Sequence, residues 1–187
     1  MGAHYAAAMA LPVSEIRRPV IAAAIAASLI ACVSAAASSP PAVVTLDGVS
    51  GVRPGMSPAQ VEHLWGFRLQ LEGGPAFPGC ETAVFRVGPI RGSVLFQNKR
   101  FRAAWFSRGI RTPSGIRIGS TVAELKRAYG SRLTREHALY VRDVWLYYLR
   151  RSKSPHWRLR FDVSAAGRVA SIGFGDSDDV TAQEGCA

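Results

Sequence analysis

Acidic residues are scarce in this chain of 187 residues. The 13 Asp and Glu residues stand against 23 Lys and Arg residues, and the formal net charge is +10 at pH 7. This imbalance excludes an acidic solvating tail and favours anionic partners. The length favours one domain or two small ones, which argues against a large multidomain enzyme.

The motifs of the common hydrolases and nucleotide-binding enzymes are also missing. The chain has no GxSxG, HExxH or phosphate-binding loop, and its histidines, His4, His63, His137 and His156, lie far apart. We therefore predict a protein that is not an enzyme, with no catalytic residue, cofactor or metal. The acidic run Gly173–Asp179 lacks the glycine and terminal Glu of a calcium loop and is interpreted as a solvated turn.

Only three cysteines occur, without a CxxC motif or a Cys/His cluster. If Cys32 is modified or removed, Cys80 and Cys186 remain as a pair, and in an oxidising compartment we expect a disulfide between them. It would close a long loop and contribute about 4 to 5 kcal/mol in the chain-entropy model. A reactive thiol or a metal ligand is the alternative interpretation.

An uncharged hydrophobic run, Val20–Val33, follows Arg17 and Arg18 near the N-terminus. It is too short and too rich in alanine for a good membrane span, so residues 1–32 are predicted to be an export signal. The run ends in Leu29-Ile30-Ala31-Cys32, which fits a lipobox with Cys32 as the lipidation site, and residues 33–44 then form a flexible tether.

Two alternatives stay open at this end of the chain. With the lipobox, the protein is anchored by lipid on the outer side of the cell membrane. Cleavage by ordinary signal peptidase after Ala35 or Ala37 would instead release a secreted protein. Met9 is an alternative start to Met1.

One sequence pattern occurs twice. Gly51–Gly66 aligns without a gap on Gly115–Gly130. Each copy predicts a helix that starts with a capping box, formed within Ser57–Gln60 and within Thr121–Glu124, and that ends at the closing glycine. The match therefore indicates an internal repeat.

Alternating apolar and polar residues predict three strands after each helix. The six ranges are Glu81–Val87, Ser93–Gln97, Lys99–Ser107, Val144–Arg151, Trp157–Ser164 and Arg168–Phe174. We predict an α+β fold for residues 45–187, in which two tandem repeats, about 45–110 and 111–187, form one antiparallel sheet with the helices packed on one face.

The run Gly-Met-Ser-Pro-Ala-Gln-Val at 55–61, closed by Gly66, resembles the motif of the β-lactamase inhibitory protein and of small outer-membrane-assembly lipoproteins. The second copy, with the ending Glu184-Gly185-Cys186, is similar to uncharacterised exported actinobacterial domains. The resemblance implies an exported, non-catalytic, protein-binding fold with a concave sheet. Inhibition of a β-lactamase is not implied, because the loops that would enter an active site are not identifiable by residue, and Ser120 stands where a full second motif has Met.

Strand alternation gives a candidate binding surface. Trp157, Leu159, Phe161 and Val163 are expected on the core face, as are Phe101, Ala103 and Trp105. The opposite face is expected to carry Arg86, Arg102, Phe106, Arg158 and Arg160. Arginine combined with aromatic residues is typical of protein-binding hot spots, while a merely solvated sheet face is the alternative.

Three classes of function fit these observations. The first is an exported module that binds an unknown envelope or extracellular protein. The second is an electrostatic binder of anionic lipid headgroups or envelope polymers, for which nucleic acid is the least expected anion in an exported chain. The third is a hydrolase without a recognisable motif.

Overall fold

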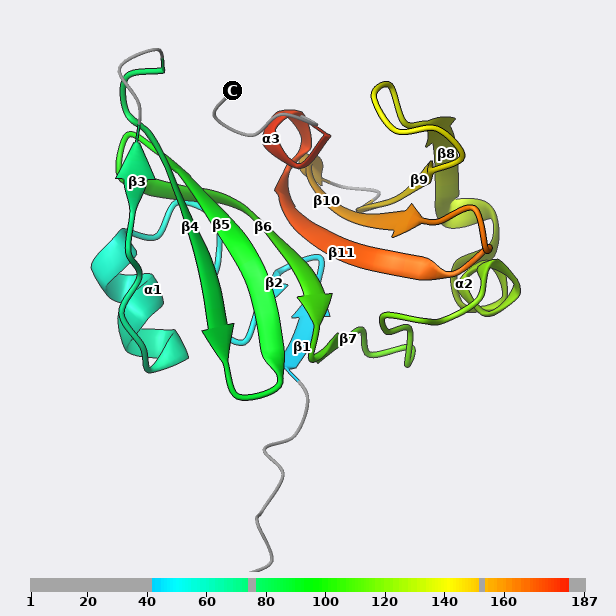
Figure 1. Ribbon diagram of the computed structural model, residues 1–187, viewed down its shortest axis with the longest axis horizontal. Coiled ribbons are helices and arrows are strands. Elements are labelled where there is room, and N and C mark those ends of the chain that lie inside the picture. The colour runs from blue at the N-terminus through cyan, green and yellow to red at the C-terminus, as the bar shows by residue number, and fades with distance from the viewer. Residues whose placement is uncertain (1–41, 74–76, 152–153, 182–187) are drawn as a thin grey trace, which may run out of the picture. The chain divides into compact units, whose positions relative to one another are not determined.

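The computed structural model describes residues 42–73, 77–151 and 154–181 (Figure 1). The predicted signal, the lipidation site Cys32, most of the tether and Cys186 lie outside the described residues. In the described part, no helix combines the length and the apolar character that crossing a membrane requires.

The two predicted helices form with their predicted caps. Helix α1 spans Pro58–Trp65 and helix α2 spans Val122–Tyr129. The Ser57 hydroxyl accepts from the Gln60 backbone N–H at 3.4 Å, and the Gln60 side chain accepts from the Ser57 N–H at 2.8 Å. The same reciprocal bonds begin α2, and a short 3₁₀ turn, η1 (Gly130–Arg132), follows it. Both capping boxes are therefore confirmed.

A large antiparallel sheet of eight strands carries the fold, in the order β3-β4-β5-β6-β11-β10-β9-β8. Their bounds are β3 Glu72–Gly73, β4 Cys80–Val87, β5 Ile90–Gln97, β6 Arg100–Arg108, β8 Leu133–His137, β9 Trp145–Arg151, β10 Ser154–Val163 and β11 Val169–Asp176. Strands β6 and β11 join the two halves of the sheet, with Ile172 paired to Phe106. The α+β class is confirmed, and β8 adds an edge strand that was not predicted.

A second, small sheet was not predicted. It has the order β2-β1-β7, with β1 Ala42–Thr45, β2 Gly48–Val49 and β7 Ile110–Arg111. Strand β1 corrects the predicted tether of residues 33–44, because residues 42–44 lie in this strand and Val44 is fully buried. The β-branched residues Val43 and Val44 explain why the chain is already extended and packed there.

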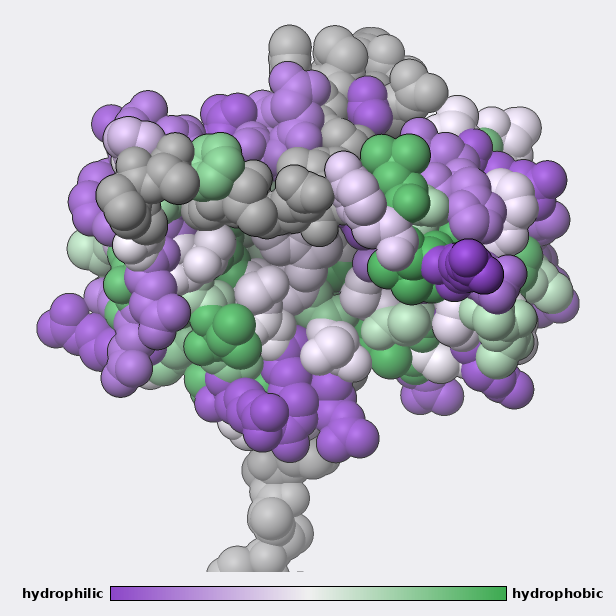
Figure 2. Space-filling view, turned by 45° about the horizontal axis from the view of Figure 1, so that its top comes forward, coloured by the Kyte–Doolittle hydropathy of each residue, from purple (hydrophilic) through white to green (hydrophobic). Residues whose placement is uncertain are grey.

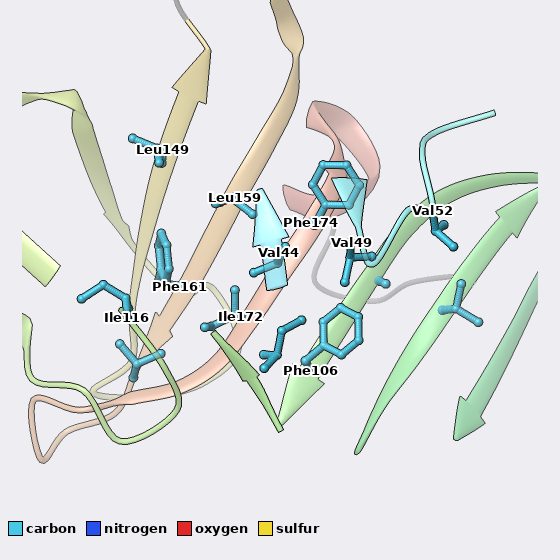
Figure 3. Packing of buried hydrophobic residues seen from close by; sticks show 14 of the residues in the cluster. Val44, Val49, Val52, Phe106, Ile116, Leu149, Leu159, Phe161, Ile172 and Phe174 are labelled. Atoms are coloured by element: carbon cyan, nitrogen blue, oxygen red, sulfur yellow. The ribbon is translucent and has the colours of Figure 1, made fainter. Parts of the chain in front are cut away.

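The main core lies between one face of the large sheet and three other elements: α1, α2 and the small sheet. Figure 3 shows Val44 and Val49 of the small sheet close to Phe106, Ile172 and Phe174 of the large one. Helices α1 and α2 contribute Val61, Leu125 and Tyr129 to the same cluster. As predicted, Leu159, Phe161 and Val163 of β10 belong to it. We call this face of the large sheet the core face.

A β-bulge in β6 reverses the predicted alternation there. Leu95 pairs with Ala103, but the next residue of β5, Phe96, pairs with Phe101, so Arg102 is an additional residue on β6. Beyond the bulge, Ala104 and Phe106 point to the main core, whereas Ala103 and Trp105 point to the other face. The placement of Phe106 on the binding surface is therefore wrong.

The prediction that the helices pack on one face also needs correction. A third helix, α3 (Ser177–Thr181), follows β11 in the segment expected to be a solvated acidic turn. Its Val180 packs against Cys80, Leu95 and Ala103, on the face opposite the main core. The acidic residues therefore begin a helix that covers part of this second face.

Candidate functional site

The candidate site is the face of the large sheet that points away from the main core. We call it the open face. It is formed by alternate residues of six strands: Val84 and Arg86 of β4, Arg91 and Ser93 of β5, Trp105 of β6, Ser171 of β11, Arg158, Arg160 and Asp162 of β10, and Leu146 and Tyr148 of β9. Four of the five predicted surface residues lie on or beside it, and Phe106 does not.

Arg102, at the bulge, is held by two carboxylates. Its Nε lies 2.8 Å from Oδ2 of Asp179, and its Nη2 lies 3.3 Å from Oδ2 of Asp176. Asp176 ends β11 and also accepts from the backbone N–H of Asp178 at 3.1 Å. Arg102 therefore ties α3 to the sheet and is already engaged within the chain.

Arg160 is buried rather than presented to solvent, with a relative exposure of 8%. Its guanidinium contacts both carboxylate oxygens of Asp162, at 2.6 and 3.3 Å, and donates to the carbonyl of Val180 at 3.0 Å. Ser171 donates to the same carboxylate. A bidentate contact of this kind positions the planar guanidinium closely. Arg160 therefore fastens α3 to β10, which sequence alternation alone could not reveal.

Unlike Arg102 and Arg160, Arg158 takes part in no ion pair between described residues. Its Cζ lies 6.0 Å from the ring centroid of Tyr148, and its Nε is buried without a hydrogen-bond partner among the described residues. The Tyr148 hydroxyl donates to Glu136 at 2.7 Å. Burial, followed by this hydrogen bond, raises the pKa of Tyr148, so the phenol stays neutral and acts as a donor.

Two shallow hollows lie on the open face. The first, of about 280 Å³, is lined by Val84, Arg86, Arg91, Trp105 and Ser171 among others. The second, of about 340 Å³, is lined by residues that include Tyr140, Val141, Leu146, Arg160 and Ser171. Ser171 borders both hollows, so they adjoin along β11.

A glycine on the open face, Gly173, makes room for the indole of Trp105. A Cβ on Gly173 would lie 2.9 Å from Cδ1 of Trp105 and 3.1 Å from Cγ2 of Val180. Trp105 is paired with Gly173 across β6 and β11, and it packs against the cluster that includes Val180. The small residue thus lets the indole lie between the first hollow and α3.

Exposed apolar side chains stand at the two hollows. Val84 beside the first hollow is 81% exposed, and Tyr140 at the second is 68% exposed. Their neighbours Leu139 and Val141, in the loop after β8, are also exposed. Figure 2 shows hydrophobic patches in green among hydrophilic residues in purple. The apolar run Leu139-Tyr140-Val141 in a connecting segment was the sequence signal for this feature, and the sequence interpretation missed it.

Several titratable residues of the described part of the chain are engaged with neighbours of the same chain. No group of three His, Cys, Asp or Glu side chains that could hold a metal ion occurs there. Asp176 and Asp179 of the acidic run pair with Arg102. The His137 ring contacts the carbonyl of Ala138 and the ring of Trp145.

The sequence comparisons find no relative. No protein-family model matches the chain, and no curated protein matches it.

The comparison with solved structures finds remote similarities. One is a cysteine-rich secretory protein from Staphylococcus aureus, with a TM-score of 0.45, 12% identity, and coverage of 66% of this chain and 44% of that one. Another is an extracellular protein from Bacillus anthracis containing an SCP domain, with a TM-score of 0.46, 9% identity, and coverage of 66% and 44%. A DUF4309 family protein from Bacillus subtilis gives a TM-score of 0.43 and 12% identity, with coverage of 65% and 78%.

The chain thus spans less than half the length of the first two of these structures. At such TM-scores and identities the likeness carries no argument about site or activity. None of the three is described as a β-lactamase inhibitory protein or an assembly lipoprotein, so the resemblance drawn from the repeated motif stays a prediction.

Proposed function

We propose that the chain is an exported, non-catalytic module of the cell envelope that binds a protein partner through the open face. The observation that carries this proposal is the exposure of Val84 and Tyr140 beside two adjoining hollows. Exposed apolar side chains grouped on one surface are typical of interaction sites. Trp105 and Arg158 add the residue types that dominate protein-binding hot spots.

The contact surface is smaller than the sequence suggested. Arg102 and Arg160 are held by carboxylates of the same chain, and their role in the proposal is to fix α3 beside the hollows. The residues proposed to touch the partner are Val84, Trp105, Tyr140, Val141 and Arg158.

The test compares capture from envelope fractions by the full chain and by variants. A Val84→Ser, Tyr140→Ser variant should lose a partner that the wild type captures. Leu64→Ser is the matched control, because Leu64 is another exposed large apolar residue but lies on α1. Loss of capture by both variants, or by neither, would place the interface elsewhere.

Lipid anchoring through Cys32 belongs to the same proposal. It is supported by the sequence Leu29-Ile30-Ala31-Cys32 at the end of the hydrophobic run. Cells that express the full chain should incorporate a labelled fatty acid into the wild type and into Cys186→Ala, but not into Cys32→Ala. Equal labelling of all three proteins would refute the lipobox.

The tandem-repeat origin of the sheet is also proposed. It is supported by the aligned motifs and by their equivalent capping boxes, and each of the two helices precedes a run of antiparallel strands. In this interpretation, β4-β5-β6 corresponds to β9-β10-β11, and the β6–β11 pairing joins the two units.

A further inference from the structure

Three arginines stand side by side at one end of the large sheet. Arg86 on β4 pairs with Arg91 on β5, and Arg91 pairs with Arg108 on β6. Side chains directly opposite each other on antiparallel strands project from the same face, with Cβ atoms about 5 Å apart. We call Arg86, Arg91 and Arg108 the arginine row.

The arginine row has no counter-charge within the described part of the chain. The ion pairs found there involve other arginines and a lysine, and none joins a carboxylate to a member of the row. Like charges placed opposite each other lower the stability of a sheet. Arg102 and Arg160 are already paired with carboxylates of the chain, whereas an external anion would relieve the repulsion within the row.

An uncharged turn lies between two members of the row. Strands β4 and β5 meet at Val87-Gly88-Pro89-Ile90, with Arg86 before the turn and Arg91 after it. Gly88 and Pro89 are exposed, and Val87 and Ile90 are half-buried. Such a tip can enter the headgroup region of a bilayer while the long arginine stems carry their charges to the phosphates.

The row also lies where the N-terminal part of the chain joins the described domain. Strand β1 begins at Ala42, which pairs with Ile110, two residues after Arg108. Ala42 lines the same small cavity as Val87 and Ile90, and Figure 1 shows the start of β1 and the β4–β5 turn at the same end. The stretch from Cys32 to Ala42 spans at most about 36 Å when fully extended. An anchor at Cys32 would keep this end near the membrane.

From these observations we infer that the arginine row and the tip Val87–Ile90 dock on an anionic phospholipid surface. The lower edge of Figure 2, where β1 begins, is strongly hydrophilic, in keeping with a charged contact. Arg86 and Arg91 of the row line the first hollow, and no member of the row lines the second. Docking through the row therefore leaves the second hollow and the loop after β8 available to a protein. The inference does not depend on the identity of a protein partner.

The test is sedimentation of the purified full chain with vesicles of equimolar phosphatidylcholine and phosphatidylglycerol, and with vesicles of phosphatidylcholine alone. The triple variant Arg86→Gln, Arg91→Gln, Arg108→Gln should partition about 100-fold more weakly onto the anionic vesicles. A control variant, Arg53→Gln, Lys126→Gln, Arg127→Gln, removes the same charge from residues outside the row. It should stay within about threefold of the wild type, because attraction to the surface decays over a Debye length.

Two further results distinguish headgroup binding by the row from attraction by the net charge of the protein. The charge-preserving variant Arg86→Lys, Arg91→Lys, Arg108→Lys should keep its partitioning, because headgroup attraction needs charge and not the bidentate guanidinium. Equal loss in the row and control variants would assign the binding to net charge and overturn the inference. Loss of partitioning in the lysine variant would show that charge at these positions does not suffice for binding, and it would overturn the inference.

Discussion

Arg102 on β6 and Asp179 on α3, 77 residues apart in sequence, are joined by a contact of 2.8 Å between Nε and Oδ2. Arg102 is an additional residue in its strand, since the β-bulge places it outside the regular pairing with β5. It is therefore free to turn towards α3. This contact links the bulge that reverses the face of Phe106 to the helix that covers part of the open face.

A double-mutant cycle should measure this contact. Arg102→Ala and Asp179→Ala should each lower the free energy of unfolding, and the double variant should reveal a coupling of about 0.5 to 1 kcal/mol, because the pair is partly exposed. Denaturant unfolding of the four proteins gives this value. Strictly additive effects would show that the contact does not hold α3.

Arg160→Ala should lower the free energy of unfolding far more than Arg158→Ala. Arg160 is 8% exposed, and its loss would leave the carboxylate of Asp162 without its charged partner, at a cost of about 3 kcal/mol. No ion pair between described residues includes Arg158. Arg158→Ala should therefore lower the free energy of unfolding by less than about 1 kcal/mol. Thermal unfolding compares the two variants directly, and equal midpoints would contradict the structural role of Arg160.

Local sequence signals predicted much of the sheet. The six predicted strands match β4, β5, β6, β9, β10 and β11 to within a few residues at each end. Both α1 and α2 were indicated by a cap, an apolar stripe and a glycine, for example Ser57, Val61 and Gly66. These signals depend on neighbours within one element, so one sequence suffices to detect them.

The candidate site depended on contacts that the sequence pattern does not encode. A bulge inserts a single residue, and this changed the face of Phe106 without a change in composition. The strands of the small sheet have two to four residues, too few for a clear alternation. The burial of Arg160 requires Val180 of α3, which is distant in sequence. Contacts between distant segments therefore determine which arginines of the open face can contact a partner.

Glu124 should make the protein sensitive to acid through the cap of α2. The backbone N–H of Thr121, followed by its hydroxyl, donates to the carboxylate and holds the pKa of Glu124 below 4.5. The folded state therefore favours the charged carboxylate. The stability that this carboxylate contributes is present above pH 4.5 and is lost as the pH falls through the lowered pKa. As the pH falls through this range, the thermal midpoint of Glu124→Gln should fall less than that of the wild type. Glu72→Gln, at an exposed position, is the control and should retain the fall seen in the wild type.

A disulfide between Cys80 and Cys186 should fix the C-terminal segment over the open face. Cys80 packs in one cluster with Val180, six residues before Cys186, a separation that a chain of this length can span. Mass spectrometry of the exported protein without reductant should find the two residues linked. Cys80→Ser should lower the free energy of unfolding by about 2 to 5 kcal/mol. Two free thiols in the exported protein would exclude the bond.

Arg91 should lower the stability of the protein, because it stands between Arg86 and Arg108 in the arginine row. Arg91→Thr replaces the central charge with a residue that suits a strand, and it should raise the free energy of unfolding by about 0.2 to 1 kcal/mol. Arg91→Lys keeps the charge and should show no such gain, and added salt should reduce the difference between Arg91→Thr and the wild type, since it screens the repulsion. Denaturant unfolding in low and high salt measures both effects. A lower stability for Arg91→Thr would mean that this arginine contributes more by packing its stem than it loses by repulsion, and it would remove the energetic argument that the row needs an external anion.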